Sequence, residues 1–145
     1  MQDRIWKIPF NLEVLNQTGQ NTMVEACGIV FTDFGDDWLK ATMPVNEKTV
    51  QPVRILHGGA NVVLAETMGS VASILCLEDM NKSNVVGVEI NANHLRSVPE
   101  GQSVTGTVRP VRIGRKLHVW QIEIHDEQER LVCTSRLTAM VVERK

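Results

Sequence analysis

The hydrophobic positions of this chain form one long run near its middle, between Gly58 and Glu78. A segment of this length without proline predicts a helix that is hydrophobic on nearly every face and is therefore packed inside the fold. Glu66 is the single charged residue within the run. Because glutamate is rarely buried unless a partner or a function compensates for the cost, Glu66 is the first candidate for chemistry.

Shorter apolar segments on both sides of this helix predict strands. The predicted strands are residues 24–31, 38–45, 85–95, 101–111, 116–125 and 131–142. Four apolar side chains of the third segment alternate on one face, as in a half-buried strand: Val86, Val88, Ile90 and Ala92. Near the N-terminus, Asn11 is predicted to cap a short helix that ends at Gly19.

Short connections predict antiparallel pairing of neighbouring strands, and the central helix is the element able to cover the apolar face of such a sheet. We therefore expect an α+β fold, with residues 1–145 forming a single domain in which the sheet wraps around the helix. A net charge of −2 offers no sequence-wide basic field for nucleic acid. The absence of a transmembrane or signal-like run predicts a cytoplasmic protein that binds no membrane.

Projection of the helix at 100° per residue gives it one face that is small and polar. Glu66 shares this face with Gly59, Gly69, Ser70 and Ser73. Such a stripe lets another backbone or a ligand come close to the carboxylate. The alternative is that the stripe is the solvent-facing side of an ordinary amphipathic helix and that Glu66 is merely hydrated.

The residues just before the helix favour an active site. Gln51 supplies an amide, His57 an imidazole, and Gly58 an unhindered backbone N–H at a helix N-terminus. Gly58 and Glu66 are eight residues apart, which separates their backbones by about 12 Å along a helix. A donor and a base acting on one carbonyl must both lie about 3 Å from it. We therefore hypothesise a two-fold dimer whose antiparallel helices place Gly58 of one subunit beside Glu66 of the other.

This arrangement resembles that of the hotdog-fold acyl-CoA thioesterases over nearly the whole chain. The matching pattern consists of Gln51, the His57–Gly59 triplet, Glu66 and Ser70. It resembles in particular the aromatic-acyl branch, which includes the hydroxybenzoyl-CoA type, the phenylacetate-pathway enzymes and the dihydroxynaphthoyl-CoA thioesterases of menaquinone synthesis. The segments 87–97 and 119–138 are particularly similar to the last of these. The resemblance implies a hotdog fold, an acyl-CoA substrate, no cofactor beyond that substrate, and a homotetramer built as a dimer of dimers.

The resemblance also implies roles for the matching residues. Glu66 would act on the thioester as general base towards water or as nucleophile through a transient anhydride, and the sequence does not choose between them. The Gly58 N–H would stabilise the oxyanion, and Gln51 would place the thioester or the water. Ser70 would hold the water or the carboxylate. His57 would orient its loop or contact the acyl oxygen, with a structural turn histidine as the alternative.

In the resembling family, two further regions and Gly87 hold the pantetheine arm and the nucleotide of CoA. Their counterparts here are His94, Leu95, Arg96 and Ser97 in one region, and Arg112, Ile113, Gly114, Arg115 and Lys116 in the other. The cationic side chains among them can pair with phosphate oxygens. For each one, the alternative is a solvated turn residue without a partner.

Two other functions stay open. A hotdog hydratase or dehydratase would need a histidine paired with an acid on or near the helix, whereas the helix body offers only Glu66. A non-catalytic acyl-CoA binding module would use Glu66 structurally. Metal chemistry is not favoured, since the four histidines and three cysteines show no ligand spacing. A serine hydrolase is not favoured either, because the chain lacks a Gly-X-Ser-X-Gly elbow.

Overall fold

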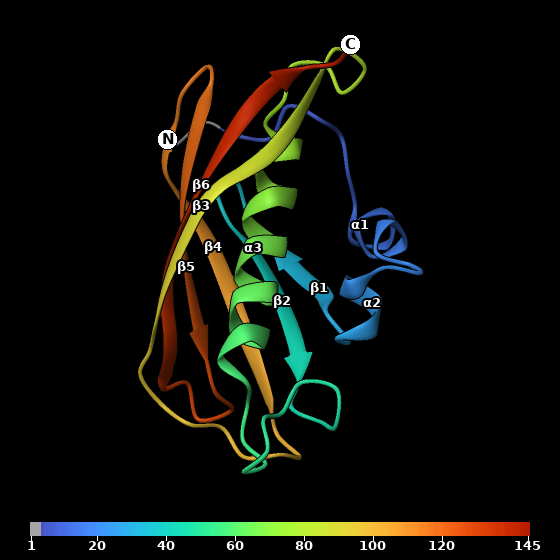
Figure 1. Ribbon diagram of the computed structural model, residues 1–145. Coiled ribbons are helices and arrows are strands. Elements are labelled where there is room, and N and C mark those ends of the chain that lie inside the picture. Colours follow the sequence, from blue (N-terminus) through green and yellow to red (C-terminus); the bar gives the residue numbers. More distant parts are fainter. Residues whose placement is uncertain (1–3) are drawn as a thin grey trace.

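The computed structural model describes residues 4–145, and it consists of a six-stranded antiparallel sheet curved around one long helix (Figure 1). The strands are β1 (Val30–Phe34), β2 (Leu39–Pro44), β3 (Ser83–His94), β4 (Ser103–Ile113), β5 (Leu117–His125) and β6 (Leu131–Glu143). The helices are α1 (Leu12–Thr18), α2 (Met23–Ala26) and α3 (Gly58–Leu75). The strand order is β1-β2-β4-β5-β6-β3, so the predicted α+β architecture is confirmed.

The long helix α3 is held by its contacts with the concave face of the sheet. Leu64, Met68 and Ala72 on its inner side are fully buried. Ser73 is also fully buried, where its Oγ accepts a hydrogen bond of 2.6 Å from Trp120 Nε1 and lies 3.0 Å from His118 Nδ1. Burial lowers the pKa of His118. No helix within residues 4–145 is long and apolar enough to cross a membrane.

The predicted small polar face of α3 is therefore only partly correct. Ser70 and Glu66 are partly exposed, but Ser73 points into the sheet. Gly69 is buried as well, and a Cβ added to it would lie 2.4 Å from Leu137 Cδ2 of β6. The prediction failed at these two positions because an ideal projection cannot show how closely the curved sheet wraps the helix.

The N-terminal part of the chain differs from its prediction at one element. As predicted, Asn11 caps α1 and Gly19 ends it. The predicted strand over residues 24–31 is wrong in its first half, where the short helix α2 begins after the cap residue Thr22. Gly28, with a φ of 74°, then turns the chain into β1. The cap and this glycine outweigh the β-branched composition of the segment.

Strand β3 departs from simple alternation because it contains a bulge between Gly87 and Glu89. Val86 and Val88 are exposed, whereas Ile90 is partly buried and packs against the core. The prediction that the four apolar residues of this strand share one inner face is therefore wrong. An extra residue in one strand reverses the side-chain alternation beyond it.

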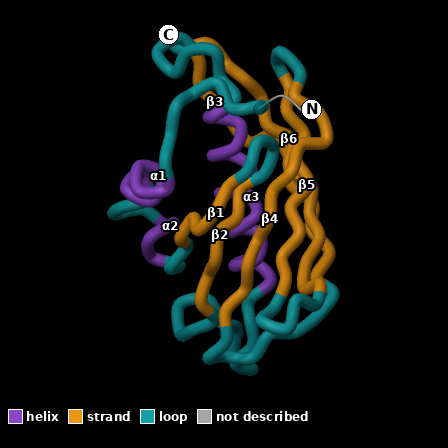
Figure 2. The backbone as a smooth tube through the Cα atoms, turned by 180° about the vertical axis from the view of Figure 1, so that it is seen from behind, coloured by secondary structure: helices purple, strands orange, loops and turns teal. Residues whose placement is uncertain are grey.

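The two edge strands of the sheet differ in whether their free backbone groups are covered. At the β1 edge, the amide of Asn16 in α1 both donates to the Phe31 carbonyl (3.0 Å) and accepts from the Phe31 N–H (2.8 Å). This side chain therefore occupies the position of a neighbouring strand. At the other edge, all twelve residues of β3 are exposed or partly exposed, and no side chain within residues 4–145 covers the strand in this way. Figure 2 shows the sheet from behind, with β1 and β2 to the left of β4 and β5 to its right.

Candidate active site

The carboxylate of Glu66 lies at the middle of α3, beside the edge strand β3. Its Oε1 is 2.7 Å from the point where a Cβ on Gly87 would stand, so the missing side chain of Gly87 makes room for the carboxylate. Within residues 4–145, no hydrogen-bond partner contacts the Glu66 side chain. The sequence assigned Gly87 to CoA binding by resemblance, and the structure places it directly against the proposed catalytic group.

A pocket of about 470 Å³ opens beside Glu66, between α3 and the α1–α2 segment. Its apolar lining consists of Leu15, Val24, Phe31, Val71 and Ile74. Thr67 and Ser70, both on α3, add hydroxyl groups to the same wall. Neither hydroxyl has a hydrogen-bond partner in the described part of the chain, so both are available to a ligand. Ser70 does not bond the Glu66 carboxylate directly, although it lies one helical turn beyond it.

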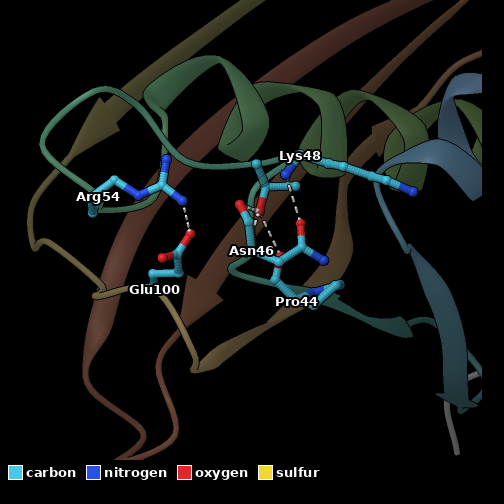
Figure 3. A network of polar contacts seen from close by, with 6 residues as sticks. Pro44, Asn46, Lys48, Arg54 and Glu100 are labelled. Carbon is cyan, nitrogen blue, oxygen red and sulfur yellow. Dashed lines mark hydrogen bonds and ion pairs between the residues drawn. The ribbon is translucent and has the colours of Figure 1, made fainter.

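The loop that leads into α3 is fixed by polar contacts (Figure 3). The hydroxyl of Thr49 donates to the Pro44 carbonyl at 2.8 Å and accepts from the Asn46 N–H at 3.0 Å. Further along the loop, Arg54 forms an ion pair with Glu100, and its backbone has a left-handed φ of 67°. Such a braced loop can hold the residues that follow it in a defined position.

Gln51 lies in this loop, and only the NH₂ half of its side-chain amide is free to bind another group. The side-chain oxygen accepts a hydrogen bond of 2.9 Å from the Val53 N–H. The amide NH₂ group has no partner within residues 4–145, and Gln51 lines a pocket shared with Gly58. Gln51 can therefore donate to a carbonyl or to a water molecule, which agrees with its proposed role.

His57 is the N-cap of α3 rather than a free imidazole. Its Nδ1 accepts a hydrogen bond of 2.8 Å from the Gly59 N–H. Its backbone carbonyl accepts from Ala60 at 3.0 Å and from Asn61 at 3.3 Å. These contacts agree with the structural alternative for His57 and with a role in orienting the loop. No carboxylate pairs with it in the described chain, so the pair required by a hydratase is missing there.

The cap leaves one N–H group open. Among the first N–H groups of α3, those of His57, Gly59 and Ala60 have acceptors, whereas that of Gly58 has none within residues 4–145. A helix N-terminus carries partial positive charge, which favours negative charge at this point. The Gly58 N–H is therefore the donor best placed to stabilise an oxyanion.

A second pocket, of about 420 Å³, gathers several predicted residues around that donor. It is lined by Gln51, Gly58 and the whole predicted segment His94–Ser97, which begins at the last residue of β3. The pocket also includes Asn61, a residue that the sequence analysis missed because an asparagine inside an apolar helix carries no motif. The Gly58 N–H and one predicted CoA region thus share one pocket, whereas Glu66 and Ser70 line the other.

The remaining predicted CoA region lies elsewhere in the chain. Ile113, Gly114 and Arg115 line a pocket of about 360 Å³ with Cys76 and Leu77, at the far end of α3 from Gly58. Arg112 and Lys116 flank the same turn between β4 and β5. One chain alone therefore does not unite the two predicted CoA regions.

Comparison with known proteins identifies relatives along nearly the full chain. The model of the thioesterase superfamily matches residues 54–133. The 1,4-dihydroxy-2-naphthoyl-CoA hydrolase of Escherichia coli strain K12 is 54% identical, covering 95% of this chain and 99% of the relative. The proofreading thioesterase EntH of Cronobacter sakazakii is 51% identical, with 95% and 98% coverage.

Solved structures agree with these relatives. A crystal structure of the Haemophilus influenzae thioesterase HI1161 superimposes with a TM-score of 0.91 at 50% identity, covering 96% of this chain and 95% of that one. A glutamine-to-alanine variant of the Pseudomonas aeruginosa thioesterase PA1618 gives a TM-score of 0.93 at 43% identity, with 97% and 99% coverage. The hotdog fold expected from the resemblance is confirmed.

Substitution of Gly58 tests the open N–H group. Proline at the first helical position removes this N–H without disturbing the helix, and His57 already has the extended backbone that precedes a proline. Gly58→Ala adds a Cβ but keeps the N–H, and it is the matched control. We expect kcat for thioester hydrolysis to be on the order of 100-fold lower in Gly58→Pro than in Gly58→Ala. Equal kcat values in the two variants would exclude this donor.

Substitution of Gly87 tests the position of the Glu66 carboxylate. The methyl group of Gly87→Ala would occupy the space that now holds Oε1, so the carboxylate must move. A displacement of about 1 Å can lower the rate roughly 100-fold, and we expect a loss of kcat of that order. In a Glu66→Ala background the clash disappears, so Gly87→Ala should lower the melting temperature less there than in the wild-type protein. An unchanged kcat would contradict this placement.

Proposed function

The chain belongs to the thioesterase superfamily and is a thioester hydrolase, and we propose that its substrate is an aromatic or similarly bulky acyl-CoA. The observation that carries this proposal is the position of Glu66 at the wall of an apolar pocket of about 470 Å³. This volume suits a bulky acyl group. The free hydroxyls of Thr67 and Ser70 suit a hydroxylated ring, and 1,4-dihydroxy-2-naphthoyl-CoA is the first candidate by analogy with the E. coli relative.

The proposed chemistry uses few groups. The Gly58 N–H, supported by the positive end of α3, donates a hydrogen bond to the thioester oxygen and stabilises the negative charge that develops there. Glu66 either removes a proton from the attacking water or attacks the carbonyl itself, after which water hydrolyses the anhydride. In both cases the carbon–sulfur bond breaks, and CoA leaves as a thiolate that takes up a proton. Gln51 donates a hydrogen bond to the carbonyl or the water, and Ser70 holds the water near Glu66.

A two-fold dimer joined along β3 brings the Gly58 N–H of one copy close to the Glu66 carboxylate of the other, which a single chain cannot do. The open edge of β3 is long and exposed, and such an edge readily pairs with another strand. Antiparallel pairing with the same strand of a second copy satisfies its free backbone groups and makes the two α3 helices antiparallel. Both halves of the site lie beside this edge, since Glu66 contacts Gly87 and Gly58 contacts His94.

These contacts specify the register of the pairing. Glu66 of one copy meets Gly58 of the other when Gly87 lies opposite His94 of the partner copy. Because the bulge between Gly87 and Glu89 adds one residue, Gly87 and His94 are six ladder positions apart, and the midpoint at which the two-fold axis passes is Asn91. The midpoint lies inside β3, and the register therefore keeps most of the strand paired.

The same register places the two predicted CoA regions, one from each copy, at the same position along the paired β3 strands. Ser83 lies in the pocket of the β4–β5 turn, and under this register it stands opposite position 98 of the other copy. The β4–β5 turn of one copy therefore lies beside the end of the His94–Ser97 segment of the partner copy. We propose that Arg96 of one copy and Arg115 of the other hold the CoA phosphates. A dimer of such dimers is the expected oligomer.

Hydrolysis of an ester panel tests the function. Free-thiol release is measured for benzoyl, hydroxybenzoyl, dihydroxynaphthoyl, phenylacetyl and medium-chain CoA esters, with wild type, Glu66→Ala and Glu66→Gln side by side. Glu78→Ala is the control, because Glu78 is an exposed acid beyond the end of the same helix. We expect the highest kcat/KM for aromatic esters and the loss of nearly all turnover in both Glu66 variants.

Other outcomes of this panel decide between the alternatives. Retained turnover in both Glu66 variants would contradict the catalytic role of this carboxylate. Ester binding without turnover in the wild type would indicate a binding module. A preference for an aromatic ester other than the naphthoyl one would keep the proposed substrate class and contradict the naphthoyl assignment.

A further inference from the structure

Asn61 is a buried polar residue whose presence the function described so far does not explain. It lies in the first turns of α3 and is only 3% exposed. Its Nδ2 is 3.3 Å from Nδ1 of His94, and its Oδ1 has no hydrogen-bond partner within residues 4–145. A buried amide that leaves an oxygen unpaired is costly, and such a group calls for a specific reason.

The orientation of the amide sets the roles of the two groups. Nδ2 of Asn61 faces Nδ1 of His94, and an amide NH₂ group can only donate a hydrogen bond. Asn61 therefore donates and Nδ1 of His94 accepts, while Oδ1 is left without a partner within residues 4–145. A neutral imidazole whose Nδ1 is an acceptor carries its proton on Nε2.

The protonated nitrogen of His94 lies close to the proposed oxyanion donor. The ring lies over Gly58, with Nε2, Cε1 and Cδ2 at 3.1, 3.3 and 3.4 Å from the point where a Cβ on Gly58 would stand. Both residues line the same pocket of about 420 Å³. The Nε2–H group and the open Gly58 N–H therefore border one space.

We propose that Asn61 is a positioning residue that acts through His94. Its amide holds the ring in the orientation and tautomer that present Nε2–H beside the Gly58 N–H, so that His94 is a second donor to the thioester oxygen. This inference rests on the proposed function, because the thioester carbonyl is the acceptor that the two donors share. Two donors on one oxygen stabilise its developing charge more than one donor does.

Asn61→Asp tests the proposal with a side chain of nearly the same shape. A carboxylate in this position accepts a hydrogen bond from Nδ1, so a neutral His94 ring is then protonated on Nδ1 and its Nε2 has no proton. We expect kcat of Asn61→Asp to fall at alkaline pH, on the order of 100-fold below wild type, and to recover at lower pH where both ring nitrogens are protonated. A purely structural role of Asn61 would lower kcat equally at every pH.

The neighbours of His94 do not produce such a profile themselves. Arg96, in the same pocket, stays charged over this range. Cys133 is the partner of His94 across the β3–β6 ladder, and burial raises the pKa of its thiol, so it stays neutral.

A proton–nitrogen NMR correlation spectrum of the His94 ring gives a readout that does not depend on turnover. At alkaline pH we expect the Nε2–H tautomer in the wild type and the Nδ1–H tautomer in Asn61→Asp. If the buried carboxylate prevents folding, Asn61→Leu replaces it, and the His94 signals should then lose their single Nε2–H form. Identical His94 spectra in wild type and variant would overturn the proposal. Absence of acyl-CoA hydrolysis in the wild type would instead overturn the proposed function. The spectra would still test whether Asn61 sets the tautomer of His94.

Discussion

Close antiparallel packing of α3 against β3 is the contact on which the candidate site depends. The two elements run in opposite directions, so the start of the helix lies beside the end of the strand. Two glycines allow the close approach: Gly58 lies under the His94 ring, and Gly87 makes room for the Glu66 carboxylate. A side chain at either position would separate a catalytic group from the strand. The buried face of α3, with Leu64 and Met68 against the sheet, holds this alignment in place.

The same packing divides the chemistry between two places on one helix. The proposed oxyanion donor is at the first residue of α3, whereas the Glu66 carboxylate lies two helical turns further on, about 12 Å away. One thioester carbonyl cannot reach both within a single chain. Each place nevertheless lies beside the open edge of β3, while the opposite edge of the sheet is closed by Asn16. The proposed pairing of the open edges accounts for both the exposed strand and the divided site.

Much of the fold and the centre of the site could be predicted from sequence, because they rest on local patterns. The apolar run predicted α3, and a lone acid within it predicted Glu66. Features that depend on tertiary contacts could not be predicted. The bulge in β3 reversed the alternation of Val86 and Val88, and the curved sheet buried Ser73. Asn61 escaped notice because its importance comes from His94, a residue distant in sequence but adjacent in space.

Complementation between two inactive variants tests the shared site most directly. Gly58→Pro and Glu66→Ala are co-expressed in equal amounts, so that half of the dimers contain one subunit of each kind. In a site shared across the two-fold axis, each mixed dimer has one site with both an intact Gly58 and an intact Glu66. The account predicts about a quarter of wild-type turnover from the mixture, although each variant alone is inactive. A mixture as inactive as its components would show that each chain holds a complete site, and it would contradict the account.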